Sequence, residues 1–112
     1  MALRLLYTLF LCLFPSQVWS LTTSEQAAHK ICSHFNGRYP NITFLSSSSQ
    51  YEAQSTENWS ETAWGKPTCI VEPTDTHDLQ EMVRTLSYRG VHFAIRSGGH
   101  MPSVVRAGCR LV

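Results

Sequence analysis

The strongest constraint on the fold of this chain is a strand–helix–strand pattern in its second half. Residues 68–71 and 91–95 are two apolar runs with the length and composition of buried strands. The segment between them begins with a capping residue, Thr74 or Asp75, ends at Gly90 and carries apolar residues at helical spacing, namely Leu79, Met82, Val83 and Leu86. Two buried strands joined by one amphipathic helix run parallel in a sheet. We therefore predict an α/β fold built on a βαβ unit.

The second predicted strand leads into a glycine loop, defined here as residues 96–100 with the sequence Arg-Ser-Gly-Gly-His. Gly98 and Gly99 permit backbone conformations closed to other residues and leave room for a ligand to approach the main chain. Their N–H groups can face an anion at the carboxyl end of a strand, where ligands of open α/β sheets bind. Taken alone the motif is weak, because it matches neither the dinucleotide-binding nor the Walker pattern and is more often an ordinary turn.

The segment before this unit begins with a predicted helix over residues 24–35. Thr22 and Glu25 have the spacing of a capping box at its start. Asn36-Gly37 reads as the turn that ends the helix.

A short strand is predicted over residues 42–45, followed by an aromatic segment over residues 51–66 that is either a loop or a short helix. A parallel pair of strands needs cover on both faces and further strands beside it. Because we find no further strand pattern after His100, we expect the sheet to be incomplete.

The first twenty residues are typical of a secretory signal peptide. Arg4 supplies the positive start, residues 5–14 the apolar stretch, and residues 18–20 a cleavage site before Leu21. The apolar stretch is shorter than the roughly twenty residues that span a bilayer. We therefore expect a secreted protein with no membrane anchor.

The net charge of the chain disfavours nucleic acid as a partner, and the spacing of its histidines and cysteines disfavours a metal ion. The net charge is +1 and charged residues make up 15% of the chain, so no basic field indicates nucleic acid. The five histidines lack His-Glu-x-x-His spacing and the cysteines lack Cys-x-x-Cys spacing, so we expect no metal site. The sequence leaves the oligomeric state open.

Secretion gives meaning to the cysteines and to two glycosylation sequons. In an oxidising compartment, a disulfide between Cys32 and Cys69 would close a long loop and stabilise the fold by about 3–4 kcal/mol. Because Cys12 would be removed with the signal peptide, Cys109 would have no partner in the mature chain. An odd cysteine suggests an intermolecular bond or an abnormal sequence around it. Asn41 and Asn58 each stand in an Asn-x-Ser/Thr pattern, and we expect both to carry glycans.

Several stretches taken together resemble the start of the FAD-binding domain of the p-cresol methylhydroxylase (PCMH) type. They are residues 67–73 (Pro-Thr-Cys-Ile-Val-Glu-Pro), Asp78-Leu79, Val83 and residues 93–100. The opening, with a signal peptide, a helix bearing a cysteine and an Asn-Trp-Ser before the Pro-x-Cys-Ile-Val-x-Pro strand, is similar to secreted fungal FAD-linked oxidoreductases of the berberine bridge enzyme family.

This resemblance covers residues 1–103 and implies a division of the chain into four parts. These are the signal peptide (1–20), an N-terminal helix with the aromatic and polar segment (21–61), the start of the FAD-binding domain (62–103) and a divergent tail (104–112).

The resemblance also implies a cofactor and the residues that hold it. Arg96, Ser97, Gly98 and Gly99 would bind the FAD diphosphate, and His100 would be the point of covalent attachment to the flavin. The chemistry suits these residues, because a neutral imidazole is a competent nucleophile near pH 7. Intact relatives would take a hydride from a small alcohol, sugar or secondary metabolite and pass the electrons to oxygen or another acceptor.

The match ends where relatives continue into a glycine-rich loop and a strand ending in an aspartate. Here residues 104–112 read Val-Val-Arg-Ala-Gly-Cys-Arg-Leu-Val. We therefore expect a truncated N-terminal fragment, incomplete as a domain, that neither retains FAD nor turns over substrate. The alternative is a small secreted non-catalytic glycoprotein or binding module that uses the aromatic segment or the glycine loop.

Overall fold

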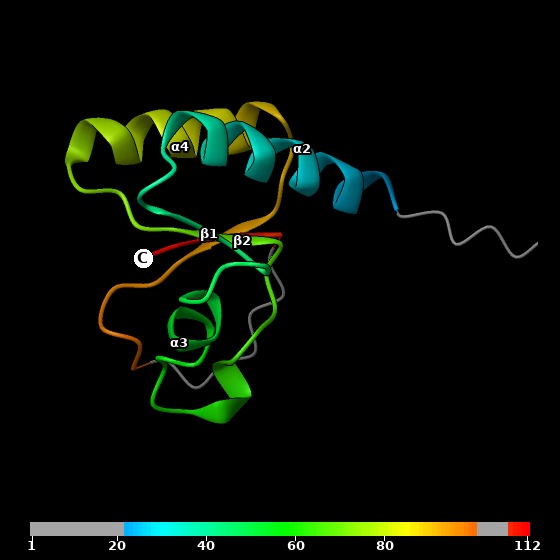
Figure 1. Ribbon diagram of the computed structural model, residues 1–112. Coiled ribbons are helices and arrows are strands. Elements are labelled where there is room, and N and C mark those ends of the chain that lie inside the picture. The colour runs from blue at the N-terminus through cyan, green and yellow to red at the C-terminus, as the bar shows by residue number, and fades with distance from the viewer. Residues whose placement is uncertain (1–21, 101–107) are drawn as a thin grey trace, which may run out of the picture.

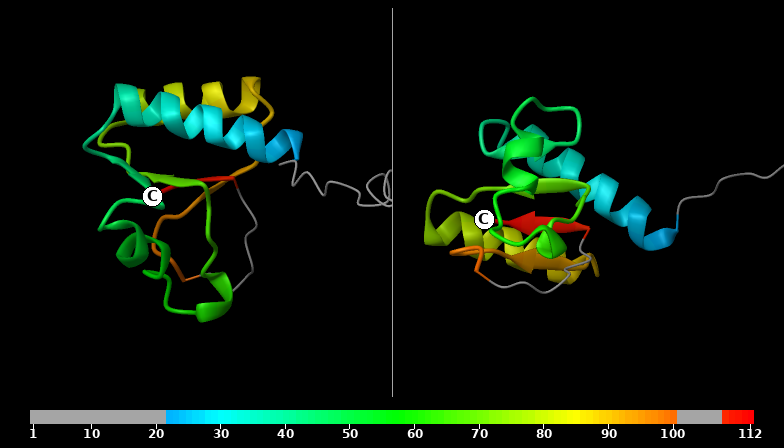
Figure 2. Two further views of the ribbon diagram at one scale, coloured as in Figure 1. Left: turned by 45° about the vertical axis from the view of Figure 1, so that its right-hand side comes forward. Right: turned by 90° about the horizontal axis from the view of Figure 1, so that it is seen from below.

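The computed structural model describes residues 22–100 and 108–112, so the predicted signal peptide lies outside the described residues. The chain forms three layers around a four-stranded sheet (Figure 1). Helices α2 (Thr23–Arg38) and α4 (Thr76–Tyr88) cover one face, while α3 (Tyr51–Ser55) and the short 3₁₀ helix η1 (Glu61–Ala63) lie on the other side. The two further views in Figure 2 show the same arrangement. None of the helices within the described residues is both long and apolar enough to cross a membrane.

The sheet has the strand order β1-β2-β4-β3. Its strands are β1 (Thr43–Leu45), β2 (Cys69–Val71), β3 (Phe93–Ile95) and β4 (Cys109–Leu111). β1 is antiparallel to β2, whereas β2 and β3 both run parallel to β4, which lies between them. The predicted parallel direction of the two strands of the βαβ unit is therefore confirmed.

The expectation that no strand remains after the glycine loop is wrong. β4 fills the place between β2 and β3, and its central residue Arg110 stands opposite Ile70 on one side and Ala94 on the other. The strand is only three residues long and has an arginine at its centre, so neither length nor apolar pattern marks it in the sequence. Backbone pairing with β2 and β3, rather than its own composition, therefore accounts for the extended conformation of β4.

Helix α2 begins as predicted and ends later than predicted. The backbone N–H of Thr22 donates to Glu25 Oε2 at 2.9 Å, and Thr22 Oγ1 accepts from the Glu25 N–H, which completes the capping box. The turn expected at Asn36-Gly37 is wrong, because the helix continues to Arg38. Pro40 disfavours helical dihedrals for the residue before it, so Tyr39 is the C-cap and the helix ends at Arg38.

Helix α4 has the ends that the sequence indicates. Asp75 is the N-cap, and its side chain accepts a hydrogen bond of 2.8 Å from the Asp78 N–H. Gly90 lies just beyond the helix with φ +63°, in the left-handed region where glycine carries no steric penalty. Met82 and Leu86 face the sheet and are fully buried.

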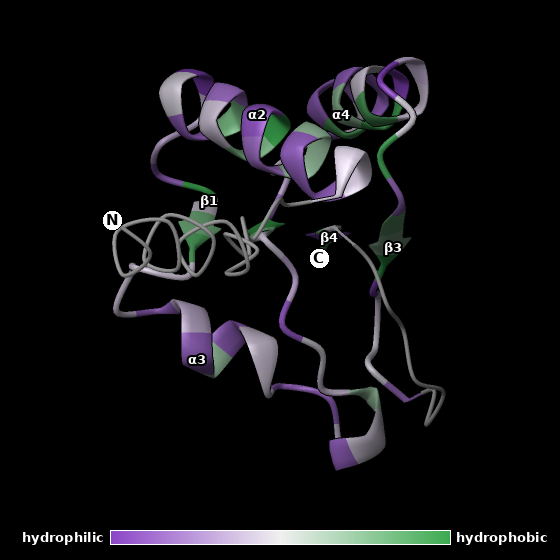
Figure 3. Cartoon of the chain, turned by 90° about the vertical axis from the view of Figure 1, so that its right-hand side faces the viewer, coloured by the Kyte–Doolittle hydropathy of each residue, from purple (hydrophilic) through white to green (hydrophobic). Residues whose placement is uncertain are grey.

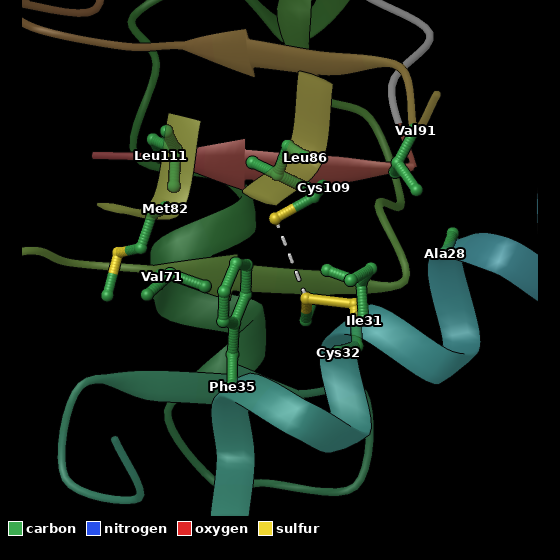
Figure 4. Packing of buried hydrophobic residues seen from close by; sticks show 11 residues of the cluster. Ala28, Ile31, Cys32, Phe35, Val71, Met82, Leu86, Val91, Cys109 and Leu111 are labelled. Carbon is green, nitrogen blue, oxygen red and sulfur yellow. Dashed lines mark hydrogen bonds between the residues drawn. A yellow bond between two sulfur atoms is a disulfide. The ribbon is translucent and has the colours of Figure 1, made fainter. Parts of the chain in front are cut away.

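The hydrophobic core lies between the sheet and the α2–α4 layer (Figure 4). Alternation along the strands sends one set of side chains from β2 and β4 toward the helices, and Figure 3 shows hydrophobic residues in both helices and in the strands. The core residues with the lowest exposure are Phe35, Cys69, Val71, Met82, Leu86, Cys109 and Leu111. The opposite face of the sheet, which carries Ile70 and Arg110, is turned to α3 and η1.

A disulfide between Cys32 and Cys69 links α2 to β2 inside this core, as the sequence suggested. The third cysteine of the described residues, Cys109, is a free thiol with no exposed surface, and its Sγ lies 3.7 Å from Cys69 Sγ (Figure 4). The suggested intermolecular bond does not fit this position, because a partner thiol cannot reach a fully buried sulfur.

Candidate functional site

The glycine loop lies at the carboxyl end of β3, as predicted, and belongs to neither a helix nor a strand. Within the described residues, the backbone N–H groups of residues 97–100 make no backbone hydrogen bond. Gly99 has φ +68°, which favours glycine, and a Cβ on Gly98 would lie 2.8 Å from the His100 ring. Glycine is therefore favoured at position 99 by its backbone conformation, and the loop N–H groups have no backbone partner among the described residues.

The five predicted cofactor-binding residues line one pocket of about 310 Å³. The loop supplies one wall, Ala94 and Ile95 extend that wall along β3, and Arg110 reaches the pocket from β4. Asn58 and Ala63 close the side formed by the aromatic segment. Residues that are far apart in the sequence thus meet at one end of the sheet.

Arg96 links the loop to the end of α3 and to the residues that follow it. Its side chain is 8% exposed, and its guanidinium donates to the Gln54 carbonyl and to Gln54 Oε1, both at 3.2 Å. Glu57 forms an ion pair with the same guanidinium and so compensates its charge. Arg96 therefore positions the loop through contacts on the side of α3.

Arg110, which the sequence analysis did not select, is 4% exposed. Its guanidinium donates to the carbonyls of Ser55 at 3.1 Å and Ala63 at 3.5 Å, which end α3 and η1. Carbonyls at helix ends lack partners within the helix, so the arginine caps both short helices. Burial lowers the pKa of Arg110, and the nearby positive charge of Arg96 lowers this pKa further.

One indole of the aromatic segment holds the loop and a second holds the segment itself. Trp59 Nε1–H donates to the His100 carbonyl, and Trp64 Nε1–H donates to the Asn58 carbonyl at 2.7 Å. The Asn58 side-chain oxygen is buried and has no hydrogen-bond partner among the described residues. Of the two predicted glycosylation sites, Asn41 is exposed, whereas Asn58 is half-buried in the pocket wall.

His100 is exposed at the rim of the pocket, with its ring against Gly98. The arrangement combines backbone N–H groups that have no backbone partner within residues 22–100 and 108–112, a buried guanidinium and an accessible imidazole. Such a set of groups can bind an anion and present a nucleophile beside it.

Two other features of the described residues lie outside this pocket. A groove of about 480 Å³ between α2 and α4 is lined by eight residues, including the exposed side chains of Lys30, His34 and Arg89. Asp75, His77 and Asp78 come close enough together to hold a cation at the start of α4, but Asp75 already caps that helix.

Comparison with known sequences gives partial matches to flavoproteins, and no family model matches the chain. The chain is 28% identical over 102 residues to a protein of Penicillium roqueforti named FAD-dependent monooxygenase, covering 91% of this chain and 20% of that protein. Proteins of the same name from Arthrobotrys oligospora and Penicillium terrestre are 40% and 38% identical over 53 and 60 residues, covering 47% and 54% of this chain. The chain spans only 10% to 20% of the length of these three relatives.

Among solved structures, the wild-type BBE-like 1 protein of Physcomitrella patens superposes with a TM-score of 0.52 at 23% identity. The match covers 81% of this chain and 18% of that protein, and it confirms the predicted α/β fold class. The sequence relatives are thus named as FAD-dependent enzymes, and the solved structure supports the fold of this chain.

Proposed function

We propose that this chain is part of a secreted FAD-linked oxidoreductase and that the pocket beside the glycine loop binds FAD. The observation that carries the proposal is the loop itself, whose N–H donors are free of described backbone partners at the carboxyl end of a parallel strand. The names of the sequence relatives support the identity of the cofactor.

The residues present fit a dinucleotide diphosphate. The φ of +68° at Gly99 favours glycine, and neither Gly98 nor Gly99 carries a side chain that would shield the loop N–H groups from a ligand. The N–H groups of Ser97, Gly98 and Gly99 would donate to phosphate oxygens, and Arg96 would hold the loop in place through Gln54 and Glu57. When bound, the flavin supplies the hydride-accepting chemistry.

We further propose His100 as the residue that attaches the flavin covalently. Its imidazole is accessible at the pocket rim, and in the neutral form it carries a nucleophilic nitrogen. Trp59 fixes the position of the backbone here by donating to the His100 carbonyl.

The substrate and the compartment are proposals for the whole protein. A small alcohol, sugar or secondary metabolite is the proposed substrate, with oxygen or another acceptor taking the electrons. The buried disulfide supports secretion, because such bonds persist in oxidising compartments. We propose that the present chain alone neither retains FAD in stoichiometric amount nor oxidises substrate, since it spans a fifth or less of the relatives.

Titration of the ¹⁵N-labelled chain with FAD, followed by amide chemical shifts, tests this proposal. We expect weak binding in fast exchange, with the largest shifts at Ser97, Gly98 and Gly99. The amides of Lys30 and Arg89 in the α2–α4 groove should stay unchanged, because that groove lies outside the proposed site.

Two alanine variants serve as a matched pair in the same titration. Gly99→Ala should weaken FAD binding because alanine is strained at φ +68°, whereas Gly37→Ala, in helix α2, should leave binding unchanged. Shifts confined to residues outside the pocket would contradict the proposed cofactor site. A flavin absorbance band that survives acid precipitation would contradict the expectation that the chain alone retains no FAD.

A further inference from the structure

The guanidinium of Arg110 carries a buried charge that no described residue neutralises. The residue is 4% exposed, and none of the ion pairs among the described residues includes it. Two carbonyl oxygens accept from its side chain, while a guanidinium has five N–H donors. Burying an ionised group without a counter-ion is costly, so this arrangement is incomplete as it stands.

The other charged groups of the pocket do not remove this deficit. Arg96 is the second guanidinium in the lining, and the carboxylate of Glu57 is already paired with it. The remaining polar side chains of the lining, those of Asn58, Ser97 and His100, include no carboxylate. The charged groups at the pocket thus sum to a positive value, and the loop N–H donors add to the positive potential.

We propose that Arg110 binds a phosphate group of the ligand in this pocket and supplies the charge that neutralises it. A guanidinium suits this task because its planar fork of donors matches two phosphate oxygens at once. The proposal deepens the proposed function and rests on it for the identity of the nucleotide, whereas the need for an anion follows from the pocket alone.

If the role of Arg110 were purely structural, its side-chain resonance would not change when a ligand is added. In that case the guanidinium would only clamp α3 and η1 to β4 through the carbonyls of Ser55 and Ala63. The two roles are separable, because only the phosphate-binding role makes the Arg110 side-chain signal depend on an added anion.

The test uses inorganic pyrophosphate as the probe and the full chain as the protein. The ¹⁵Nε–Hε resonance of each arginine side chain is followed during titration, and the affinity is measured by calorimetry for the wild type, Arg110→Gln and Arg110→Lys. Arg89→Gln is the matched control, because it removes the same charge from an exposed position in the α2–α4 groove.

We expect pyrophosphate to shift the Arg110 signal and to leave the Arg89 signal in place. Arg110→Gln should lower the affinity at least about tenfold, the effect of losing a charge-assisted hydrogen bond. Arg110→Lys keeps the charge but loses the planar fork of donors, so its affinity for pyrophosphate should lie between those of the wild type and Arg110→Gln. Arg89→Gln should bind pyrophosphate as tightly as the wild type. An Arg110 signal that does not move at saturating pyrophosphate overturns the proposal, and this reading on the wild type holds even if Arg110→Gln fails to fold.

A parallel titration with FAD and with riboflavin, which lacks phosphate, separates this inference from the proposed function. If FAD and pyrophosphate both shift Arg110 and riboflavin does not, the phosphate is the recognised group. If pyrophosphate shifts Arg110 while FAD shifts nothing in the pocket, the anion site stands and the flavin assignment fails. If FAD shifts the glycine loop but not Arg110, the flavin assignment stands and the role of Arg110 is overturned.

Discussion

At the scale of single residues, position decides what a side chain can do, and Cys109 is the clearest case. Its thiol has no exposed surface and lies 3.7 Å from the sulfur of Cys69. Burial raises the pKa of Cys109 to about 12, from an ordinary value of 9.0. Because the thiolate is the reactive form, this cysteine is inert near neutral pH although it touches a disulfide.

This raised pKa makes stability depend on pH in a defined direction. Below pH 9 the thiol is protonated in both the folded and the unfolded chain, so it makes no difference to their balance. Between pH 9 and pH 12 only the unfolded chain loses the proton, so the free energy of unfolding falls as pH rises. We expect a loss of about 1 kcal/mol at pH 10, measured by urea unfolding between pH 8 and pH 10. In Cys109→Ala the free energy of unfolding should fall less over this pH range. An equally large fall in that variant would show that Cys109 is not its cause.

The residues of the site were only partly predictable from the sequence. The glycine loop was found because its motif is local, as are the strand before it and the two glycines. The contacts that hold the two arginines of the pocket were not predicted, because they join residues far apart in the sequence. Glu57 and Arg96 are 39 positions apart, and Ser55 and Arg110 are 55 positions apart. No spacing in the sequence encodes such contacts, and they depend on how α3 lies against the sheet.

At the scale of elements, the helices were predictable because they carry their own signals. The capping box of α2 and the Asp75 cap of α4 are local hydrogen bonds between residues three apart. The strands have only three residues each, too few to show a period, and β4 is fixed by pairing with β2 and β3. Gly37 shows that a glycine does not always mark the end of a helix. It lies inside α2, which ends at Arg38 because Pro40 follows the C-cap Tyr39.

Two glycines near helix ends should respond to alanine in opposite directions. At Gly37, in helix α2, no atom lies within 4 Å of an added Cβ, so alanine should raise the free energy of unfolding by about 0.5–1 kcal/mol. At Gly90 the space is also free, but the φ of +63° strains alanine, so the free energy of unfolding should fall by about 1 kcal/mol. Chemical denaturation of both variants beside the wild type measures the two changes. Equal signs would show that the boundary of α2 or α4 is placed wrongly.

At the scale of the whole molecule, the sheet order and the disulfide bring distant segments together. The disulfide spans 37 positions and joins the helical layer to the sheet. The predicted α/β class is confirmed, whereas the completion of the sheet by β4 was not foreseen. A βαβ pattern gives the direction of its two strands, but it does not say whether a third strand enters between them.

Removal of the disulfide should show how much of the stability depends on it. Replacing both Cys32 and Cys69 with alanine should lower the free energy of unfolding by about 3–4 kcal/mol, because the unfolded chain is no longer restrained. Urea unfolding of the double variant measures the loss. A change below about 1 kcal/mol would mean that packing alone holds α2 on the sheet. The single variant Cys32→Ala is not an adequate substitute, because it leaves the thiols of Cys69 and Cys109 free to pair with each other before burial makes Cys109 unreactive.

The place of β4 in the sheet has a consequence for the order in which the protein assembles. Synthesis proceeds from the N-terminus, so Cys32 and Cys69 leave the ribosome before Cys109, which follows Cys69 by 40 positions. The first two thiols can therefore meet and oxidise while the third is still absent. Cys109 arrives later with β4, the strand that pairs with both β2 and β3. The timing of translation, added to geometry, favours the pairing seen in the folded chain.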